Sequence, residues 1–347
     1  MSGLLKSRGF QASASAVLAV GLFAFFLSRV PLSEIGASLA SASPGWLAAS
    51  VGISLGTFAF RALRWTWMLR PVGSVPWLPA FRATAIGFAA NTVLPARAGE
   101  IVRPAILARE RDLPFPALLA SIFFERMLDA LSQLCYLGLA LAGSPAGTGA
   151  GTLSSNRLRF AVAGLAAIAV GVALFAVLWR PATERLFDRL TGLLPAGLRP
   201  AARRVIHTFL DGFASLKTPR LAALVCGGSL FQWFIINVQV WCVMRAFGLH
   251  LPLSAAYVVT SAAVLGLFVP TPGGVGGYHA AVQYALTGFF GVAIATATGV
   301  ALVAHAVSFV PISMIGFALF ATSPWRRRGL GEVASEADAA RRPGEVG

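Results

Sequence analysis

The apolar runs of this chain are interrupted twice in the same way. The segments LPARAGEIVR at 94–103 and VPTPGGVGGYH at 269–279 each place a Pro-x-x-x-Gly motif after about fifteen apolar residues. Fifteen helical residues rise only about 22 Å, which is short of the roughly 30 Å hydrocarbon core of a bilayer. Residues 80–94 and 254–269 therefore each predict one arm of a re-entrant hairpin. Interrupted short segments at corresponding places in two halves of a chain are typical of a transport site near the bilayer midplane.

The longer apolar runs predict membrane-spanning helices. They lie near 12–29, 44–66, 115–142, 160–179, 221–246 and 292–322, and the two hairpins occupy 80–112 and 253–290. We therefore predict an all-α, polytopic integral membrane protein in which residues 1–325 form a single transmembrane domain. Six full spans with two inverted re-entrant hairpins fit this pattern, and eight full spans remain an alternative because an even number of crossings also leaves both termini on the same side of the membrane. The composition agrees, since 57% of the residues are hydrophobic and only 12% are charged, about half the charged share of a soluble domain.

Basic residues predict the orientation. The segment 180–220 contains seven Arg and one Lys, whereas the loop 143–156 contains neither. By the positive-inside rule the basic segment and both termini are cytoplasmic and the loop is external, in a multi-pass protein of the cell membrane. Apolar residues at helical spacing within 180–220 indicate either an amphipathic helix at the inner interface or ordinary packing between elements. The tail at 326–347 has mixed charge and many Ala and Gly residues, so we expect it to be disordered.

The net charge of +15 could indicate a nucleic-acid partner, but the basic residues lie beside hydrophobic segments and no nucleic-acid motif accompanies them. Membrane lipids with anionic or zwitterionic headgroups are the predicted partners instead. The three cysteines lack C-x-x-C spacing, and the sequence has no His/Cys cluster with metal-ligand spacing, no P-loop and no G-x-S-x-G motif. We therefore predict no metal, no cofactor and no catalytic residue.

Three ionisable residues lie near the middle of one predicted span. Glu125, Arg126 and Asp129 follow about ten residues of the run at 115–142. The twelve strongly apolar residues of that run contribute about −0.3 to −0.6 kcal/mol each, and an Arg or Asp at a helix centre costs roughly 2.5 to 3.5 kcal/mol. Because this balance is close to zero, the charges need partners inside the protein. A structural ion pair between helices is one interpretation; a substrate or proton pathway is the one we favour.

Other candidates lie at a span end and at the two breaks. Arg61 and Arg64, one helical turn apart, either snorkel to the interface or grip a phosphate. A half-helix starting near Gly99 would direct free N–H groups and a positive dipole toward an anionic headgroup. The glycines of the second break allow close approach of a ligand or a helix, and His279 either satisfies a local hydrogen bond or titrates. The predicted substrate-binding residues are Arg61, Arg64, Asn91, Arg97, Gly99, Glu100, Arg103, Glu125, Arg126, Asp129, Gly273, Gly274, Gly276 and His279.

Four sequence blocks in a fixed order carry a family resemblance. They are Arg61-x-x-Arg64-Trp65, NTVLPARAGEIVR at 91–103, FERMLD at 124–129 and PTPGGVGGYH at 270–279. With these blocks the chain resembles the lysylphosphatidylglycerol synthase transmembrane-region family over about residues 10–322. The resemblance implies a flippase-like protein: in members fused to a synthase this region is held to move aminoacylated phosphatidylglycerol to the outer leaflet, and archaeal relatives are linked to dolichol-phosphate-sugar handling. His279 departs from the family pattern, since many relatives have Glu after the glycines.

The leading hypothesis is a lipid flippase or transporter that moves a phospholipid or a polyprenyl-phosphate-linked lipid, downhill or coupled to an ion or proton. The arginines would hold phosphate, and the carboxylates would balance charge or recognise an amine. An intramembrane enzyme that acts on a lipid-linked phosphate or sugar is the rival, and a non-catalytic partner of a separate lipid-modifying enzyme is the third hypothesis. A homo-oligomer is a further expectation. About twenty-five residues follow the last predicted span, so we do not expect this chain to synthesise lysylphosphatidylglycerol itself.

Overall fold

The computed structural model describes residues 30–94, 97–143, 218–269 and 271–327, together with isolated residues at 17–28 and 164–200. Helices connected by short loops make up this part of the chain, which confirms the predicted all-α class. The longer helices are α2 (Leu32–Ala40), α3 (Pro44–Leu69), α4 (Trp77–Val93), α5 (Gly99–Arg111), α6 (Phe115–Gly143), α10 (Pro219–Ala246), α11 (Leu253–Gly266), α12 (Gly277–Tyr284) and α13 (Ile294–Ala321). Three short helical turns, η3 (Pro272–Gly274), η4 (Ala285–Phe289) and η5 (Pro324–Arg327), complete the described elements.

Three of these helices, α3, α10 and α13, are long and apolar enough to cross a membrane, with 26, 28 and 28 residues. They correspond to the predicted spans at 44–66, 221–246 and 292–322. Helix α6 has 29 residues and matches the predicted span at 115–142, but Glu125, Arg126 and Asp129 make its first half more polar. The predicted spans at 12–29 and 160–179, the basic segment at 180–220 and the tail beyond 327 lie wholly or mostly outside the described residues.

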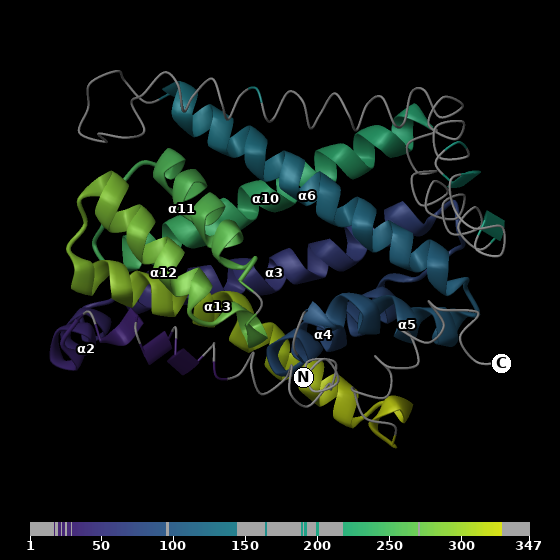
Figure 1. The fold of residues 1–347 in the computed structure, drawn as a ribbon, viewed down its shortest axis with the longest axis horizontal. Helices are drawn as coiled ribbons and strands as arrows, with labels where there is room; N and C mark the ends of the chain where they lie inside the picture. The colour runs from purple at the N-terminus through teal and green to yellow at the C-terminus, as the bar shows by residue number, and fades with distance from the viewer. Residues whose placement is uncertain are drawn as a thin grey trace.

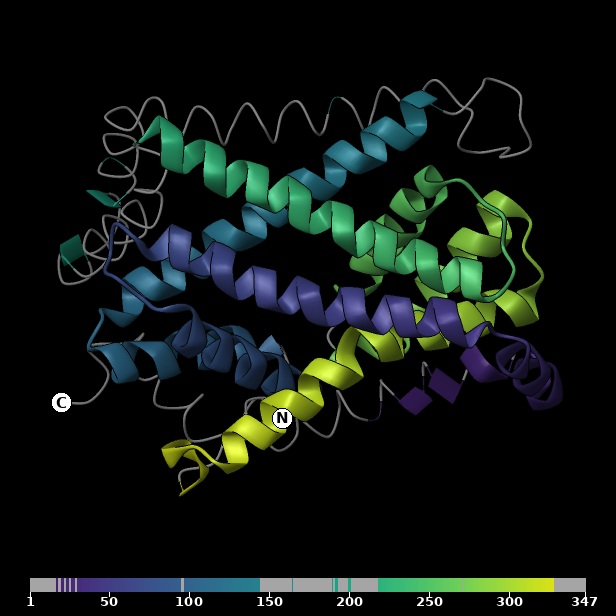
Figure 2. The same ribbon diagram turned by 180° about the vertical axis from the view of Figure 1, so that it is seen from behind.

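Both predicted breaks separate two helices that pack against each other as a hairpin. The first hairpin pairs α4 with α5, and the second pairs α11 with α12. In Figures 1 and 2 the two hairpins lie toward opposite ends of the long axis, and each runs from its end toward the centre of the molecule. Their tips meet there, because α4 of the first hairpin packs against η3 of the second. The two hairpins therefore point toward each other.

A pair of glycines brings the two arms of each hairpin together near its tip. In the first hairpin, a Cβ atom on Gly99 would overlap the carbonyl oxygen of Gly87 and the side chain of Asn91. In the second, a Cβ atom on Gly277 would overlap the carbonyl oxygen of Gly266, and a Cβ on Gly266 would overlap that of Gly277. Only glycine permits so close a backbone approach, so the two arms pack through glycines in the same way in both hairpins.

The buried apolar residues form one large cluster around each hairpin. The first lies among α3, α4, α5 and α6 and includes Trp65, Ile106 and Phe124. The second lies among α10, α11, α12 and α13 and includes Met244 and Leu286. The molecule thus has two packed halves, and the hairpin tips meet where the halves join.

Candidate functional site

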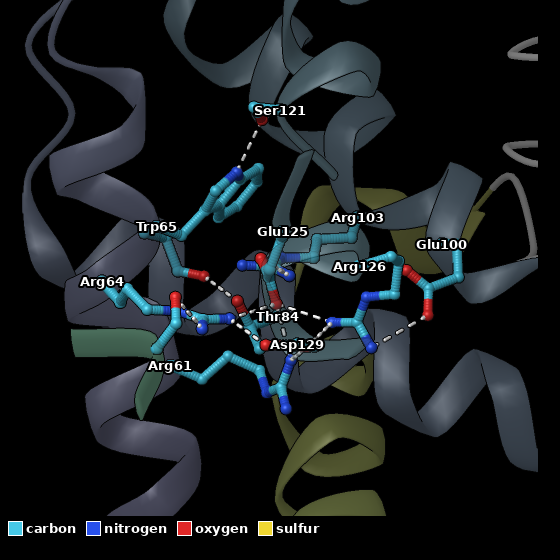
Figure 3. Close-up of polar contacts among 12 residues, drawn as sticks. Arg61, Arg64, Trp65, Thr84, Glu100, Arg103, Ser121, Glu125, Arg126 and Asp129 are labelled. Carbon is cyan, nitrogen blue, oxygen red and sulfur yellow. Dashed lines mark hydrogen bonds and ion pairs between the residues drawn. The ribbon is translucent and has the colours of Figure 1, made fainter. Parts of the chain in front are cut away.

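A buried cluster of charges joins three helices of the first half. Arg61 and Arg64 project from α3 toward Glu125 and Asp129 of α6 (Figure 3). Arg61 Nη1 donates to Glu125 Oε1 at 2.6 Å and to Asp129 Oδ2 at 3.1 Å, while Arg64 Nη2 donates to Asp129 Oδ1 at 2.8 Å. Arg103 of α5 donates to Oε2 of Glu125 at 2.9 Å. Both carboxylates therefore have arginine partners for both of their oxygens.

The environment of the two α3 arginines excludes the snorkelling alternative. Arg64 is fully buried, and the Trp65 that follows it is fully buried as well. The Trp65 Nε1–H donates to the hydroxyl of Ser121 at 2.9 Å, and the guanidinium carbon of Arg103 lies 3.8 Å from the centroid of the Trp65 ring. The arginines thus face the protein interior, where Trp65 supports the position of Arg103 by a cation–π contact.

Arg126 connects this cluster to a more open environment. Its Nη2 lies 2.6 Å from Glu125 Oε1 and 3.3 Å from Asp129 Oδ2, and its Nη1 lies 3.8 Å from Glu100 Oε1. The side chains of Arg126 and Glu100 are 30% and 25% exposed, whereas that of Glu125 is fully buried. The cluster therefore has a closed structural side around Glu125 and an accessible side around Arg126.

A cavity of about 320 Å³ lies on the accessible side of the cluster. The tips of both hairpins line it, through Asn91 and Arg97 of the first and through residues between Ala263 and Tyr278 of the second. Arg61, Arg126 and Asp129 complete its charged wall. Phe268 also lines the cavity and is 75% exposed, so the cavity reaches the molecular surface at an aromatic residue. Its volume lies at the lower end of the range of small-molecule sites.

Arg97 lies in this wall with an unusual backbone. Its φ of 57° is in the left-handed region, where residues other than glycine are strained. Among the described residues, no carboxylate lies within ion-pair distance of Arg97. Asn91, which also lines the cavity, accepts a hydrogen bond from the Gly99 N–H at 2.8 Å. The first N–H of α5 is therefore used inside the hairpin and does not face a ligand, in contrast to the role predicted for the start of this half-helix.

The charges of this region do not cancel. Arg61, Arg64, Arg97, Arg103 and Arg126 occupy it together with only three carboxylates, Glu100, Glu125 and Asp129, which leaves two positive charges in excess among the described residues. The Nε atoms of four of these arginines, and Nη2 of Arg103, also lack a hydrogen-bond partner. Arg61, Arg64 and Arg103 are buried, whereas Arg97 is exposed and Arg126 is partly exposed. An excess of arginine at one site suits an anionic ligand.

The glycines of the second break differ in their positions. Gly273 and Gly274, with φ of 63° and 72°, line the cavity. Gly276, with φ of 89°, and His279 lie outside the cavity lining; the Gly276 N–H donates to His279 Nδ1 at 3.2 Å and caps α12. His305 of α13 lies 2.8 Å from the carbonyl oxygen of Gly273 through its Nε2. His279 thus satisfies a local hydrogen bond, as one of the two alternatives predicted.

The chain is similar in sequence to a known family of membrane proteins. The model of the family described as "Lysylphosphatidylglycerol synthase TM region" matches residues 13–316 of this chain. The chain belongs to this family. A curated relative, glycosyltransferase AglD of Haloferax volcanii, is 27% identical over 336 aligned positions, which cover 84% of this chain and 50% of the relative. The chain therefore spans about half the length of that relative. Together with its apolar helices, the family membership identifies a membrane protein.

The structure brings most of the predicted residues of this family member to one place. Nine of the ten predicted positions in the first half take part in the ion-pair cluster or line the cavity, and the tenth, Gly99, donates its N–H to Asn91 of the lining. In the second half, Gly273 and Gly274 line the cavity. Gly276 and His279 do not line it and are hydrogen-bonded to each other.

Sequence reasoning missed a neutral polar wall of the same cavity. Gln239 of α10 donates to the hydroxyl of Ser308 of α13 at 3.2 Å, and both residues line the cavity. Trp233 and Thr260 line it too, and the Trp233 Nε1–H and the Thr260 hydroxyl have no hydrogen-bond partner in the described part of the chain. Single polar residues within long apolar runs were the available signal. Buried polar groups without partners are uncommon and call for an explanation, such as a ligand.

Proposed function

We propose that this protein moves a lipid with an anionic headgroup between the leaflets of the membrane, with the headgroup in the cavity and the hydrocarbon chains in the bilayer. The observation that carries the proposal is a cavity bounded by the tips of both hairpins, with an excess of arginine in one wall. A transport site at the meeting point of two inverted elements is typical of secondary transporters.

The charged wall supports binding of a phosphate group. Arg97 has no ion pair among the described residues, and Arg61 and Arg126 have Nε atoms without hydrogen-bond partners. Guanidinium groups bind phosphate through charge-assisted hydrogen bonds, which are about twice as strong as neutral ones. The left-handed backbone of Arg97 adds support, since strained residues concentrate at functional sites. Arg97 and Arg126 are therefore the proposed headgroup contacts.

The apolar mouth supports a lipid over a soluble anion. Phe268 is 75% exposed at the mouth of the cavity, and the neighbouring Leu265 is 67% exposed. Phe88, Val264 and Leu267 line the interior nearby. A ligand with a charged head and apolar chains would satisfy both walls, because the chains could leave past Phe268 into the bilayer while the phosphate stays with the arginines.

Transport in this proposal uses the two hairpins as re-entrant elements. Six helices would cross the membrane fully, both termini would be cytoplasmic, and the cavity would open alternately to the two sides by movement of one half against the other. The sequence has no nucleotide-binding motif, so the lipid would move down its gradient or together with an ion or proton.

An enzyme that acts on a lipid-linked sugar is the rival function, since the curated relative is named a glycosyltransferase. Its catalytic base would be one of the carboxylates of the cluster. Glu125 and Asp129, however, each have both oxygens engaged by arginines at 3.1 Å or less. A carboxylate stabilised in its charged form by several cations is a weak base. This pairing argues against Glu125 and Asp129 as the base. Glu100, which is 25% exposed and lies 3.8 Å from Arg126, is the remaining candidate for that role.

Leaflet exchange in liposomes tests the proposal. The purified protein is reconstituted with fluorescent phosphatidylglycerol, and the accessible label is bleached from outside. We expect protein-dependent exchange that falls at least about tenfold in the Arg97→Gln variant, because a hydrogen bond to a charged group contributes roughly 1.5–3 kcal/mol. Arg82→Gln is the matched control, since Arg82 lies outside the cavity lining and its partner Glu110, at 3.7 Å, has a side chain that is 20% exposed.

The outcomes separate the hypotheses. New lipid species in the same vesicles, without exchange, would favour the enzyme. Neither exchange nor product would favour a non-catalytic partner of a separate lipid-modifying enzyme. Equal loss of exchange in Arg97→Gln and Arg82→Gln would remove Arg97 from the headgroup site.

A further inference from the structure

We infer that the cavity selects lipid headgroups that combine a phosphate with neutral hydroxyl groups and rejects headgroups that carry an amine, a lysine ester above all. This inference rests on the proposed function and specifies its substrate class. Glycerol phosphate and sugar phosphate headgroups share the chemistry it requires.

The first argument is the absence of a free carboxylate in the described wall of the cavity. Asp129 is the only acidic residue among the described lining residues. Its Oδ1 accepts from Arg64 at 2.8 Å, and its Oδ2 lies 3.1 Å from Arg61 and 3.3 Å from Arg126. An ammonium group would have to displace one of these arginines to reach it. Asp129 therefore holds the arginines in place and is not available to recognise an amine.

The second argument is the sign of the local charge. Arg61, Arg97 and Arg126 all line the cavity, against Asp129 alone. A lipid such as phosphatidylglycerol brings one negative charge to this wall, whereas its lysyl ester brings a net positive charge. Like charges placed together in a partly buried site are strongly unfavourable and are a common means of rejecting a wrong ligand.

Three of the aromatic residues that line the cavity, Phe88, Tyr278 and Phe309, already contact groups of the protein. The guanidinium carbon of Arg61 already lies 5.7 Å from the centroid of the Phe88 ring, which is within cation–π distance. Tyr278 and Phe309 pack against the His305 ring, with centroid distances of 4.9 and 4.6 Å. These rings are thus engaged with protein groups.

The neutral polar wall of the cavity favours headgroups that carry hydroxyl groups. Gln239 and Ser308 form a hydrogen-bonded pair across α10 and α13, and Thr260 and Trp233 contribute a hydroxyl and an N–H without partners. Hydroxyl groups both donate and accept, so glycerol or sugar hydroxyls could bond to all four residues. A site built to bond hydroxyl groups rejects analogues that lack them, because its own polar groups then remain unpaired.

Binding and exchange together test this inference. The detergent-purified protein is incubated with phosphatidylglycerol, its lysyl ester, phosphatidylethanolamine and a glycosylated polyprenyl phosphate at equal concentration, and bound lipid is quantified by native mass spectrometry. We expect the phosphatidylglycerol or the glycosyl phosphate to bind at least about tenfold more than the two amine lipids, and the Arg97→Gln variant to lose that preference. The tighter binder of phosphatidylglycerol and the glycosylated polyprenyl phosphate shows whether the headgroup is a glycerol phosphate or a sugar phosphate.

An isosteric variant tests the charge argument directly. Gln239→Glu adds a carboxylate to the cavity wall, and we expect it to raise binding of the lysyl ester relative to phosphatidylglycerol by at least about fivefold. Gln283→Glu is the control, because Gln283 bonds Thr298 and lies outside the described cavity lining. Equal or preferred binding of the lysyl ester by the unmodified protein would overturn the inference. Selective binding without leaflet exchange would overturn the proposed transport but support the headgroup selection. Equal exchange of all four lipids would support transport but overturn the headgroup selection.

Discussion

Replacement of Glu125 by glutamine should destabilise this protein more than any other single loss of a carboxylate. Glu125 is fully buried and lies within 4 Å of four arginines. The Glu125→Gln variant keeps the shape of the side chain but removes its charge. Arg103, which has no other ion pair among the described residues, would then be a buried cation without a counterion.

The expected magnitude follows from burial. Removal of one partner from a buried ion pair typically costs about 3–5 kcal/mol, whereas an exposed pair contributes about 0–1 kcal/mol. We therefore expect Glu125→Gln to lower the free energy of unfolding by about 3–5 kcal/mol. Glu110→Gln should lower it by less than about 1 kcal/mol, since Glu110 and its partner Arg82 are 20% and 33% exposed and 3.7 Å apart.

Equilibrium unfolding in mixed micelles, followed by tryptophan fluorescence, measures both changes. The double variant Glu125→Gln/Arg103→Gln provides a further test, because it removes both partners of the 2.9 Å bond. We expect its loss of stability to be smaller than the sum of the two single losses by about 1–3 kcal/mol. The loss of the Arg103 cation–π contact with Trp65 reduces this difference. An effect of Glu125→Gln no larger than that of Glu110→Gln, or strict additivity in the double variant, would refute the buried network as the source of stability.

Two further predictions concern the hairpins and the topology. Gly99→Ala should destabilise the protein by about 1–3 kcal/mol through overpacking of α4 against α5. Gly138→Ala should be neutral or slightly stabilising, because a Cβ atom there would meet nothing within 4 Å. Thermal unfolding of both variants measures the difference. In a cysteine-free background, an impermeant thiol reagent applied from outside should label a cysteine at Gly288 and spare one at Gly192, as two inverted hairpins and a cytoplasmic 180–220 segment require; the opposite labelling would contradict the proposed orientation.

The helical breaks were predictable from sequence because their cause is local. A proline removes a backbone donor and restricts the residue before it, and glycines allow positive φ, so Pro95 to Gly99 and Pro270 to Gly276 end one helix and start another whatever surrounds them. The observed arms, α4 with α5 and α11 with α12, agree with these signals to within a few residues. The need of Glu125, Arg126 and Asp129 for partners inside the protein was predictable for a similar reason, since charged residues are costly within an apolar run.

The pairing of those charges was not predictable, because it depends on how α3, α5 and α6 pack. Arg103 reaches Glu125 only because Gly87 and Gly99 let α5 lie directly against α4. The neutral polar wall could not be predicted for the same reason. Gln239 and Ser308 are isolated in apolar helices 69 residues apart, and only the contact of α10 with α13 makes them a pair.

The two hairpins share their glycine crossing but not their charge, and this difference bears on how the cavity could open. Ion pairs tie the first hairpin to its neighbours, through Arg103 to α6 and through Glu100 to Arg126. The described residues of the second hairpin contain no Asp, Glu, Lys or Arg, and the polar contacts of its tip with the rest of the molecule include the bond from Gly273 to His305. Separation of a buried ion pair costs several kcal/mol, whereas small-residue surfaces can slide past one another without losing a charged partner. The first hairpin should therefore stay with α3 and α6 at the proposed phosphate site, and the second half, with its hairpin, should be the part that moves to uncover it.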